Sequence, residues 1–266
     1  MKLIATDLDG TLIRQDRTVS PRTVAVFRRL EQSGVFIVLV TGRPIRWIYP
    51  VYEQLGVRAL TICANGASTY DPATDTVVHS APLEREALAE AVSRLRAEVP
   101  GVVFAVEQDG GRQMRHEPHF PVGPWEVDHH TVAPASLAEI LTRPAAKLLV
   151  RAGAQPPDEF TARVGACLSG LAEATNSSSS GMVEVSAFGV TKASALARVA
   201  RTHAVAQADV IAFGDMPNDL PMLTWAGRGV AMANAHPAVR AAANDTTDST
   251  NEEDGVALYL ERVYNY

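Results

Sequence analysis

The sequence predicts an α/β fold in which a doubly wound, mostly parallel sheet carries an inserted α+β domain. Three apolar runs, at residues 1–6, 35–40 and 60–64, have the composition of strands buried inside a sheet. Patterns typical of helices separate these runs with short connections, and strand–helix–strand units of this kind form parallel sheets. From about residue 82 to residue 187 the pattern changes to short strands set apart from helices, which indicates an inserted unit.

The first helix is expected to begin at Ser20-Pro21, because this pair matches an N-cap followed by proline at the first helical position. Gly34 fits the C-terminal end of this helix, directly before the second apolar run. Another helix pattern extends over residues 45–55, where Pro50 has to kink or split it. The third apolar run then completes the first strand–helix–strand series.

The inserted domain is assigned to residues 82–187, and the surrounding core to residues 1–81 and 188–266. Its elements are expected at the following positions: helices at 84–98 and 157–171, and strands at 102–106, 147–151 and 182–185. The stretch 108–134 is rich in Gly, Pro and His and matches no regular pattern, and the serine-rich stretch 177–181 is expected to be a surface turn.

The parallel pattern resumes near Gly189, where Thr191 is placed to cap a helix. A buried strand is expected at 209–213 and a further short strand at 229–232. The segment 250–263 begins with acidic residues and ends in an amphipathic helix, which closes the predicted core.

Charge and composition limit the classes of function. The chain has 266 residues, 47% of them hydrophobic, and a formal net charge of −6. An acidic balance argues against nucleic acid or an anionic membrane as a partner, and no apolar run approaches the roughly 20 residues that a membrane span needs. Two cysteines, Cys63 and Cys167, provide no disulfide framework. We therefore expect a cytoplasmic monomer or weak homodimer that binds neither nucleic acid nor a membrane.

Polar residues end three of the expected strands. They are Asp7 and Asp9 after the first, Thr41, Gly42 and Arg43 after the second, and Asp215, Asn218 and Asp219 after the strand at 209–213. Because ligands of doubly wound sheets bind beyond the carboxyl ends of the strands, we expect these side chains to form one site. A simpler interpretation of each acidic group is a surface turn, or carboxylates placed favourably at a helix N-terminus.

Lys192 lies in the first turn of an expected helix, where a positive charge opposes the helix dipole. An exposed surface lysine is one interpretation, but three acidic strand ends favour a lysine that balances their charge. The carboxylates of Asp7, Asp9, Asp215 and Asp219 make an oxygen-rich set that suits Mg²⁺. Such an ion neutralises phosphate oxygens and aligns a carboxylate for in-line attack.

Five motifs give the chain a resemblance to the haloacid dehalogenase (HAD) superfamily. They are DLDGTL at 7–12, TGRP at 41–44, ANGA at 64–67, GVTK at 189–192 and GDMPND at 214–219. GVAMANAHP at 229–237 and TNEEDGVA at 250–257 resemble the Cof-type, class IIB phosphatases in particular. The chain departs from this family at Ala193, where glycine is common. The insert resembles a C2 cap in its position and length.

The resemblance implies a role for each matching residue. Asp7 would be the nucleophile that forms an aspartyl-phosphate, and Asp9 the acid that protonates the leaving oxygen and then activates water. Mg²⁺ would be bound by the carboxylates of Asp7 and Asp215 and the backbone carbonyl of Asp9, with Asp219 acting directly or through a water. The phosphoryl oxygens would be held by Thr41, the backbone at Gly42, Lys192 and Asn218.

Residues that select the substrate are less apparent from the sequence. Arg43 either contacts the phosphoryl group or pairs with the cap or another strand end. In the insert, Arg115, Trp125 and His129 are candidates to face the substrate. A zinc site is the other interpretation of the histidines in this stretch, although their spacing fits no usual ligand pattern: His116, His119, His129 and His130.

Three functions remain open on these grounds. The first is a Mg²⁺-dependent phosphatase acting on small phosphorylated metabolites, sugar phosphates above all. The second is a phosphomutase, in which the same aspartyl-phosphate returns its phosphoryl group to a substrate. The third is a receiver-like signalling module whose phosphorylated aspartate acts as a switch, but such a module needs neither a leaving-group acid nor a large insert.

Overall fold

The computed structural model describes residues 2–123, 131–176 and 181–265. Within these residues, one group of strands and helices forms the core. Its strands are β1 (Leu3–Thr6), β2 (Phe36–Val40), β3 (Leu60–Cys63), β4 (Ser68–Asp71), β5 (Thr76–Ser80), β12 (Val210–Gly214), β13 (Arg228–Ala231) and β14 (Asp245–Thr246). Its α-helices are α1 (Pro21–Gln32), α2 (Tyr49–Leu55), α6 (Lys192–Thr202), α7 (Leu220–Trp225), α8 (Pro237–Ala242) and α9 (Gly255–Tyr264). Its 3₁₀ turns are η1 (Ile45–Trp47), η2 (Ala64–Gly66), η4 (Gln207–Asp209), η5 (Pro217–Asp219) and η6 (Asn251–Glu253).

The remaining described elements lie between β5 and α6 in the chain. The strands are β6 (Val103–Gln108), β7 (Gln113–His116), β8 (Val132–Pro134), β9 (Lys147–Arg151), β10 (Ala172–Thr175) and β11 (Val183–Ala187). The helices are α3 (Arg85–Glu98), α4 (Leu137–Ile140) and α5 (Pro157–Cys167), with the 3₁₀ turn η3 (Asp109–Gly111).

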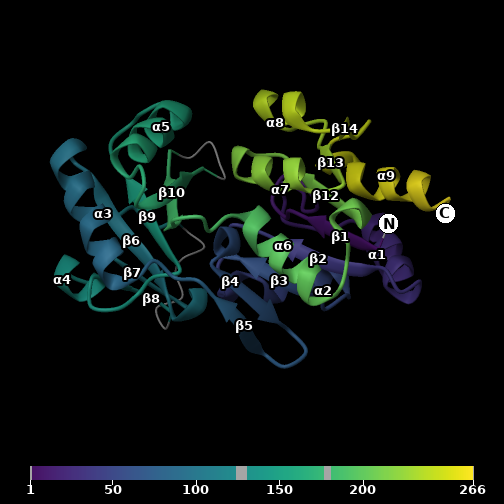
Figure 1. The fold of residues 1–266 in the computed structure, drawn as a ribbon, viewed down its shortest axis with the longest axis horizontal. Helices are drawn as coiled ribbons and strands as arrows, with labels where there is room; N and C mark the ends of the chain where they lie inside the picture. Colours follow the sequence, from purple (N-terminus) through teal and green to yellow (C-terminus); the bar gives the residue numbers. More distant parts are fainter. Residues whose placement is uncertain (1, 124–130, 177–180, 266) are drawn as a thin grey trace.

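The described strands form two sheets, which lie side by side along the length of the molecule (Figure 1). The core sheet has eight strands in the order β14-β13-β12-β1-β2-β3-β4-β5. The second sheet has six strands in the order β10-β11-β9-β6-β7-β8. In the core, α1 packs against α2 and α9, while α6 packs against α7, which in turn packs against α8. The predicted fold class, a doubly wound and mostly parallel α/β sheet with an inserted α+β part, is confirmed.

Strand β1 lies in the middle of the core sheet because its side chains are apolar enough to be buried on both faces. All four of its residues are buried, and it pairs in parallel with β12 on one side and with β2 on the other. Since these three strands run in the same direction and in register, the residues that follow them meet at one edge of the sheet. These residues are Asp7, Thr41 and Asp215.

The predicted helix boundaries have a clear basis in side-chain capping. Ser20 caps α1, since its hydroxyl accepts the backbone N–H of Thr23 at 3.0 Å, and Thr191 caps α6 in the same way. The helix pattern over 45–55 is split, as Pro50 predicts: η1 comes first, and Pro50 lies in the first turn of α2.

Several elements were not expected from the sequence. Strands β4 and β5 extend the core sheet as an antiparallel pair, although β5 is half-exposed and carries only a weak apolar signal. The irregular stretch 108–134 contains β7 and β8, which pair in parallel. These strands are short and partly polar, so their pairing depends on neighbours that are distant in the chain. Most of the serine-rich turn predicted at 177–181 lies outside the described residues.

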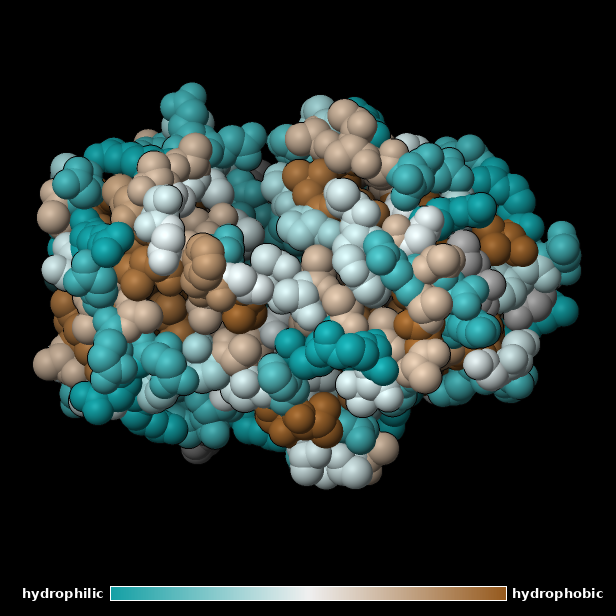
Figure 2. All heavy atoms as spheres, in the orientation of Figure 1, coloured by the Kyte–Doolittle hydropathy of each residue, from teal (hydrophilic) through white to brown (hydrophobic). Residues whose placement is uncertain are grey.

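The surface carries the mixture of hydrophobic and hydrophilic side chains that the composition predicts. On the face drawn in Figure 2, hydrophobic side chains occur in small groups surrounded by hydrophilic ones, as is usual for a surface exposed to water. In the described part of the chain, no helix combines the length and the apolar character needed to cross a membrane.

Candidate active site

A buried lysine lies at the centre of the site. Lys192 is 1% exposed, and its ammonium donates to Asp7 Oδ1 at 2.7 Å and to Asp219 Oδ1 at 2.6 Å. The lysine is the first residue of α6, whereas Asp7 follows β1 and Asp219 ends η5, so three distant segments meet here. An ammonium between two buried carboxylates makes strong, charge-assisted hydrogen bonds. The interpretation of Lys192 as an exposed surface residue is therefore wrong.

Asp219 also fixes the backbone of the loop that carries Asp215. Its Oδ2 accepts the N–H groups of Asp215 and Met216 at 3.0 and 3.1 Å. Gly214 makes this possible, since a Cβ at that position would lie 2.5 Å from the Asp219 side chain. Both carboxylate oxygens of Asp219 are thus engaged within the protein.

Asp215 is held by the loop that follows β1. Thr11 donates its hydroxyl to Asp215 Oδ1 at 2.8 Å. Gly10 has a φ of 77°, and a Cβ there would lie 2.4 Å from Asp215 Oδ2, so only glycine fits this turn without displacing the carboxylate. The DLDGT sequence therefore brings two strand ends into direct contact.

The donor set of this cluster fits a small divalent cation. Asp7, Asp215 and Asp219 can each offer a carboxylate oxygen, with these atoms within 4.8 Å of one another. Burial raises the pKa of Asp7 well above its ordinary value, against the opposing charge of Lys192, and raises that of Asp215 to about 7, with a further contribution from Asp219. Burial alone would lower the pKa of Lys192, but Asp219 and Asp7 outweigh it and raise that pKa. One ammonium does not balance three buried carboxylates, so the cluster favours an additional positive charge.

The raised pKa of Asp215 predicts how pH affects stability when no divalent cation is present. An unfolded aspartate ionises near pH 4, whereas Asp215 in the folded protein keeps its proton until about pH 7. The folded state thus binds more protons in this window, and stability falls as pH rises through it. We expect the melting temperature of Asp215→Asn, measured in EDTA, to rise relative to the unsubstituted protein as pH increases from about 4 to 7. The corresponding difference in the free energy of unfolding is about a few kcal/mol at most.

Saturating Mg²⁺ provides the control for this measurement, because a bound cation removes the cost of ionising the carboxylate. The difference between the two proteins should then shrink or reverse. Melting curves of both proteins that shift in parallel with pH in EDTA would contradict the expected role of Asp215.

Asp9 has a different environment from Asp7. It is exposed, and Arg43 binds it with two hydrogen bonds, Nε to Oδ2 at 2.7 Å and Nη2 to Oδ1 at 2.6 Å. Of the alternatives expected for Arg43, the structure shows the pairing with another strand end, here with Asp9. Thr41 accepts the N–H of Arg43 at 3.0 Å, which shapes the turn after β2.

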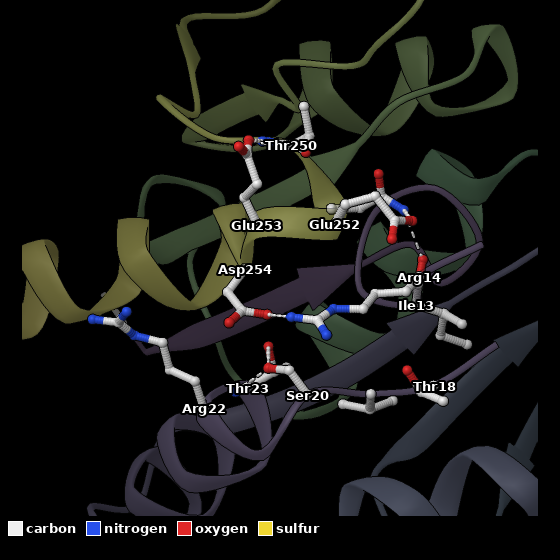
Figure 3. Close-up of polar contacts among 12 residues, drawn as sticks. Ile13, Arg14, Thr18, Ser20, Arg22, Thr23, Thr250, Glu252, Glu253 and Asp254 are labelled. Carbon is white, nitrogen blue, oxygen red and sulfur yellow. Dashed lines mark hydrogen bonds and ion pairs between the residues drawn. The ribbon is translucent and has the colours of Figure 1, made fainter. Parts of the chain in front are cut away.

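The loop from Asp9 to Arg14 is held by the acidic segment near the C-terminus (Figure 3). Arg14 points toward Asp254 and pairs with it at 2.9 Å, and Asn251 donates to the carbonyl of Ile13 at 3.0 Å. Asn234 donates to the carbonyl of Gly10 at 2.8 Å. The 229–237 and 250–257 motifs therefore support the loop that carries Asp9.

An open cleft of 690 Å³ leads from this cluster to the second sheet. On the core side it is lined by Asp7, Asp9, Thr41, Gly42, Arg43 and Asn218, among others. Its far side is formed by residues of the second sheet and its loops, including Glu107, Phe120, Lys147, Leu149, Met182 and Glu184. Charged groups and apolar side chains thus face the same space.

Of the candidates in the insert, the one in the described part of the chain, Arg115, does not lie at this cleft. Its guanidinium donates to the carbonyl of Met114 at 2.9 Å. His116 is buried, with Nδ1 at 2.9 Å from the carbonyl of Glu117. Trp125, His129 and His130 lie outside the described residues, so their predicted roles stay predictions.

Sequence reasoning missed the charged residues of the insert that line the cleft. Lys147 and Glu184 are buried and paired with each other at 2.7 Å. Lys147 begins the strand KLLVR and Glu184 lies within VEVSA; both strands are mostly apolar, and these positions were the available signal. A charged residue inside a buried strand requires a partner, which the sequence alone did not identify.

Comparison with known proteins agrees with this geometry. A family model described as haloacid dehalogenase-like hydrolase matches residues 4–260. The 5-amino-6-(5-phospho-D-ribitylamino)uracil phosphatase YitU of Bacillus subtilis (strain 168) is 31% identical over 269 residues, covering 99% of this chain and 97% of that protein.

Solved structures are also similar over their full length. A haloacid dehalogenase-like hydrolase from B. subtilis has a TM-score of 0.84 at 25% identity and covers 99% of this chain and 100% of its own. The HAD subclass IIB sugar phosphatase BT4131 has a TM-score of 0.82 at 20% identity, with both chains fully covered. With the family model spanning nearly the whole sequence, the chain belongs to the haloacid dehalogenase-like hydrolases, and its full-length relatives identify it as a phosphatase.

Proposed function

We propose that this protein is a Mg²⁺-dependent phosphatase that hydrolyses small phosphorylated metabolites through a phosphoryl-aspartate on Asp7. The observation that carries the proposal is the buried Asp7–Lys192–Asp219 cluster, whose Asp7 lines an open cleft. A carboxylate held by an ammonium is fixed in position for in-line attack on a phosphorus atom.

The chemistry divides into two displacements. In the first, a carboxylate oxygen of Asp7 forms a bond to phosphorus while the bond to the ester oxygen breaks, and Asp9 gives its proton to that leaving oxygen. In the second, Asp9 takes a proton from water, whose oxygen attacks the same phosphorus and releases Asp7 and inorganic phosphate. The exposure of Asp9 supports this assignment, since its proton can exchange with solvent between the two steps.

The remaining residues would hold the phosphoryl oxygens. Lys192 offers its ammonium, Thr41 its hydroxyl, Gly42 its backbone N–H and Asn218 its amide. The carboxylates of Asp7 and Asp215 would hold Mg²⁺ together with the backbone carbonyl of Asp9. When bound, the ion neutralises the charge that develops on the phosphoryl oxygens. Asp219 is assigned mainly to Lys192 and to the loop backbone, because both of its oxygens are engaged there.

We further propose that residues 82–187 form a cap that selects the substrate. The cleft reaches Phe120, Leu149 and Met182 on that side and Trp47 on the core side, so apolar surface adjoins the phosphate position. The names of the relatives describe phosphate esters of a ribitylamino-uracil and of sugars. Together these observations favour a phosphorylated sugar or polyol, with or without an attached ring.

The proposal is tested by measuring inorganic phosphate released from a panel of phosphorylated sugars, polyols and ring compounds. We expect turnover with Mg²⁺, at least a tenfold loss in excess EDTA, and recovery when Mg²⁺ is restored. Ca²⁺ should not restore it, because its larger and looser coordination shell misaligns nucleophile and phosphorus. Full turnover in EDTA, or a product that retains its phosphate, would contradict the proposal.

A further inference from the structure

The buried pair of Lys147 and Glu184 connects the second sheet to the core. The two residues lie on the neighbouring strands β9 and β11, with Lys147 Nζ at 2.7 Å from Glu184 Oε1. Lys147 also donates to the backbone carbonyl of Gly42 in the core, at 2.7 Å. Burying an ion pair this deeply costs desolvation free energy, and apolar side chains of similar volume would fill the same space without that cost.

Two side-chain amides connect this ion pair to the candidate phosphate site through hydrogen bonds. Asn65 Nδ2 donates to Glu184 Oε2 at 2.7 Å, and Asn218 Nδ2 donates to Asn65 Oδ1 at 3.1 Å. An ionised carboxylate only accepts hydrogen bonds, so Glu184 requires the NH₂ group of Asn65 to face it. The side-chain oxygen of Asn65, Oδ1, must then face Asn218, whose NH₂ group donates to it. The charge of Glu184 therefore sets the orientation of both amides.

Asn65 is well placed to transmit this orientation. It has a φ of 55°, a left-handed conformation that asparagine tolerates better than most residues, and its N–H donates to the carbonyl of Thr41 at 3.1 Å. A Cβ on the neighbouring Gly66 would lie 2.4 Å from the Thr191 carbonyl, so this turn is packed against the start of α6. Asn65 is thus fixed between the turn after β2 and the helix that carries Lys192.

We propose that Glu184, with Lys147 as its counter-ion, is a positioning residue for phosphate binding. By orienting Asn65 and Asn218, it directs the second N–H of the Asn218 amide toward a phosphoryl oxygen in the cleft. The inference rests on the proposed function and adds to it a link between the two sheets. Glu184 and Lys147 belong to the insert and Asn65 and Gly42 to the core, so the phosphate site is complete only when the insert is seated as in this structure.

The test compares Glu184→Gln and Asn65→Gly with the matched control Glu117→Gln. Glycine suits the left-handed backbone at position 65. Glu117 is also a carboxylate of the insert, paired with Arg96 and bound to the N–H of Phe104 at 2.8 Å, but it does not line the cleft. The readouts are the KM for a phosphate ester and the Ki of inorganic phosphate as product inhibitor. Neither quantity depends on the fraction of protein that is folded.

We expect KM and Ki to rise together by about tenfold in Glu184→Gln and Asn65→Gly, with a smaller change in kcat, and to stay unchanged in Glu117→Gln. The double variant should be no worse than Asn65→Gly alone, because both substitutions interrupt the same chain of hydrogen bonds. A lower melting temperature with unchanged KM and Ki would mean that the pair is only structural. Additive effects in the double variant would also overturn the inference. Failure of the unsubstituted protein to release phosphate would instead refute the proposed function.

Discussion

Replacing Asp7 by asparagine is expected to lower phosphate release by about 10⁴-fold or more. The substitution keeps the size of the side chain but replaces the attacking carboxylate with an amide, which is a poor nucleophile. Lys192 keeps its second partner, Asp219, at 2.6 Å, and one buried negative charge is removed, so the protein should remain folded. The measurement is steady-state phosphate release, together with the melting temperature.

Asp248→Asn is the matched control for this variant. It also removes one carboxylate, but from an exposed ion pair with Arg262, and Asp248 does not line the cleft. We expect its activity to equal that of the unsubstituted protein. If Asp7→Asn retained even a tenth of the activity while remaining folded, another group would have to be the nucleophile.

The sequence predicted the centre of the site because strand topology determines it. Asp7, Thr41 and Asp215 each follow an apolar run, and parallel strands place such residues at one edge. Lys192 was also predicted, since its position at the start of a helix has a cost that nearby carboxylates offset. These residues could be assigned together because the order of β1, β2 and β12 follows from local patterns and general rules of chain connection.

The far side of the cleft could not be predicted in the same way. Lys147 and Glu184 are separated by 37 positions, and only the antiparallel pairing of β9 with β11 brings them together. Candidates in the insert such as Arg115 were chosen by residue type, and the sequence did not reveal which face of a strand each side chain occupies. The pairing of Arg43 with Asp9 also depends on tertiary geometry, so the sequence left its partner open.

Asp9→Asn should block the reaction at a different stage from Asp7→Asn. The nucleophile is intact, but the acid for the leaving oxygen and the base for water are both missing. General acid–base catalysis contributes typically about 10² to 10⁴ in rate, and turnover should fall by that range. Because hydrolysis has lost its base, phosphoryl-Asp7 should accumulate, and it should form faster from acyl phosphates, whose leaving groups need no proton.

Acid-quenched labelling with a phosphate-labelled substrate, followed by mapping of the labelled peptide, distinguishes the two variants. Label on the peptide that contains Asp7 is expected in Asp9→Asn and absent in Asp7→Asn. Arg43→Gln is the control, because it breaks the same ion pair with Asp9 but leaves the carboxyl group in place. That variant should turn over without accumulating label, since its acid and base are retained. Equal labelling of Asp7→Asn and Asp9→Asn, or label on a histidine, would overturn the assignment of both carboxylates.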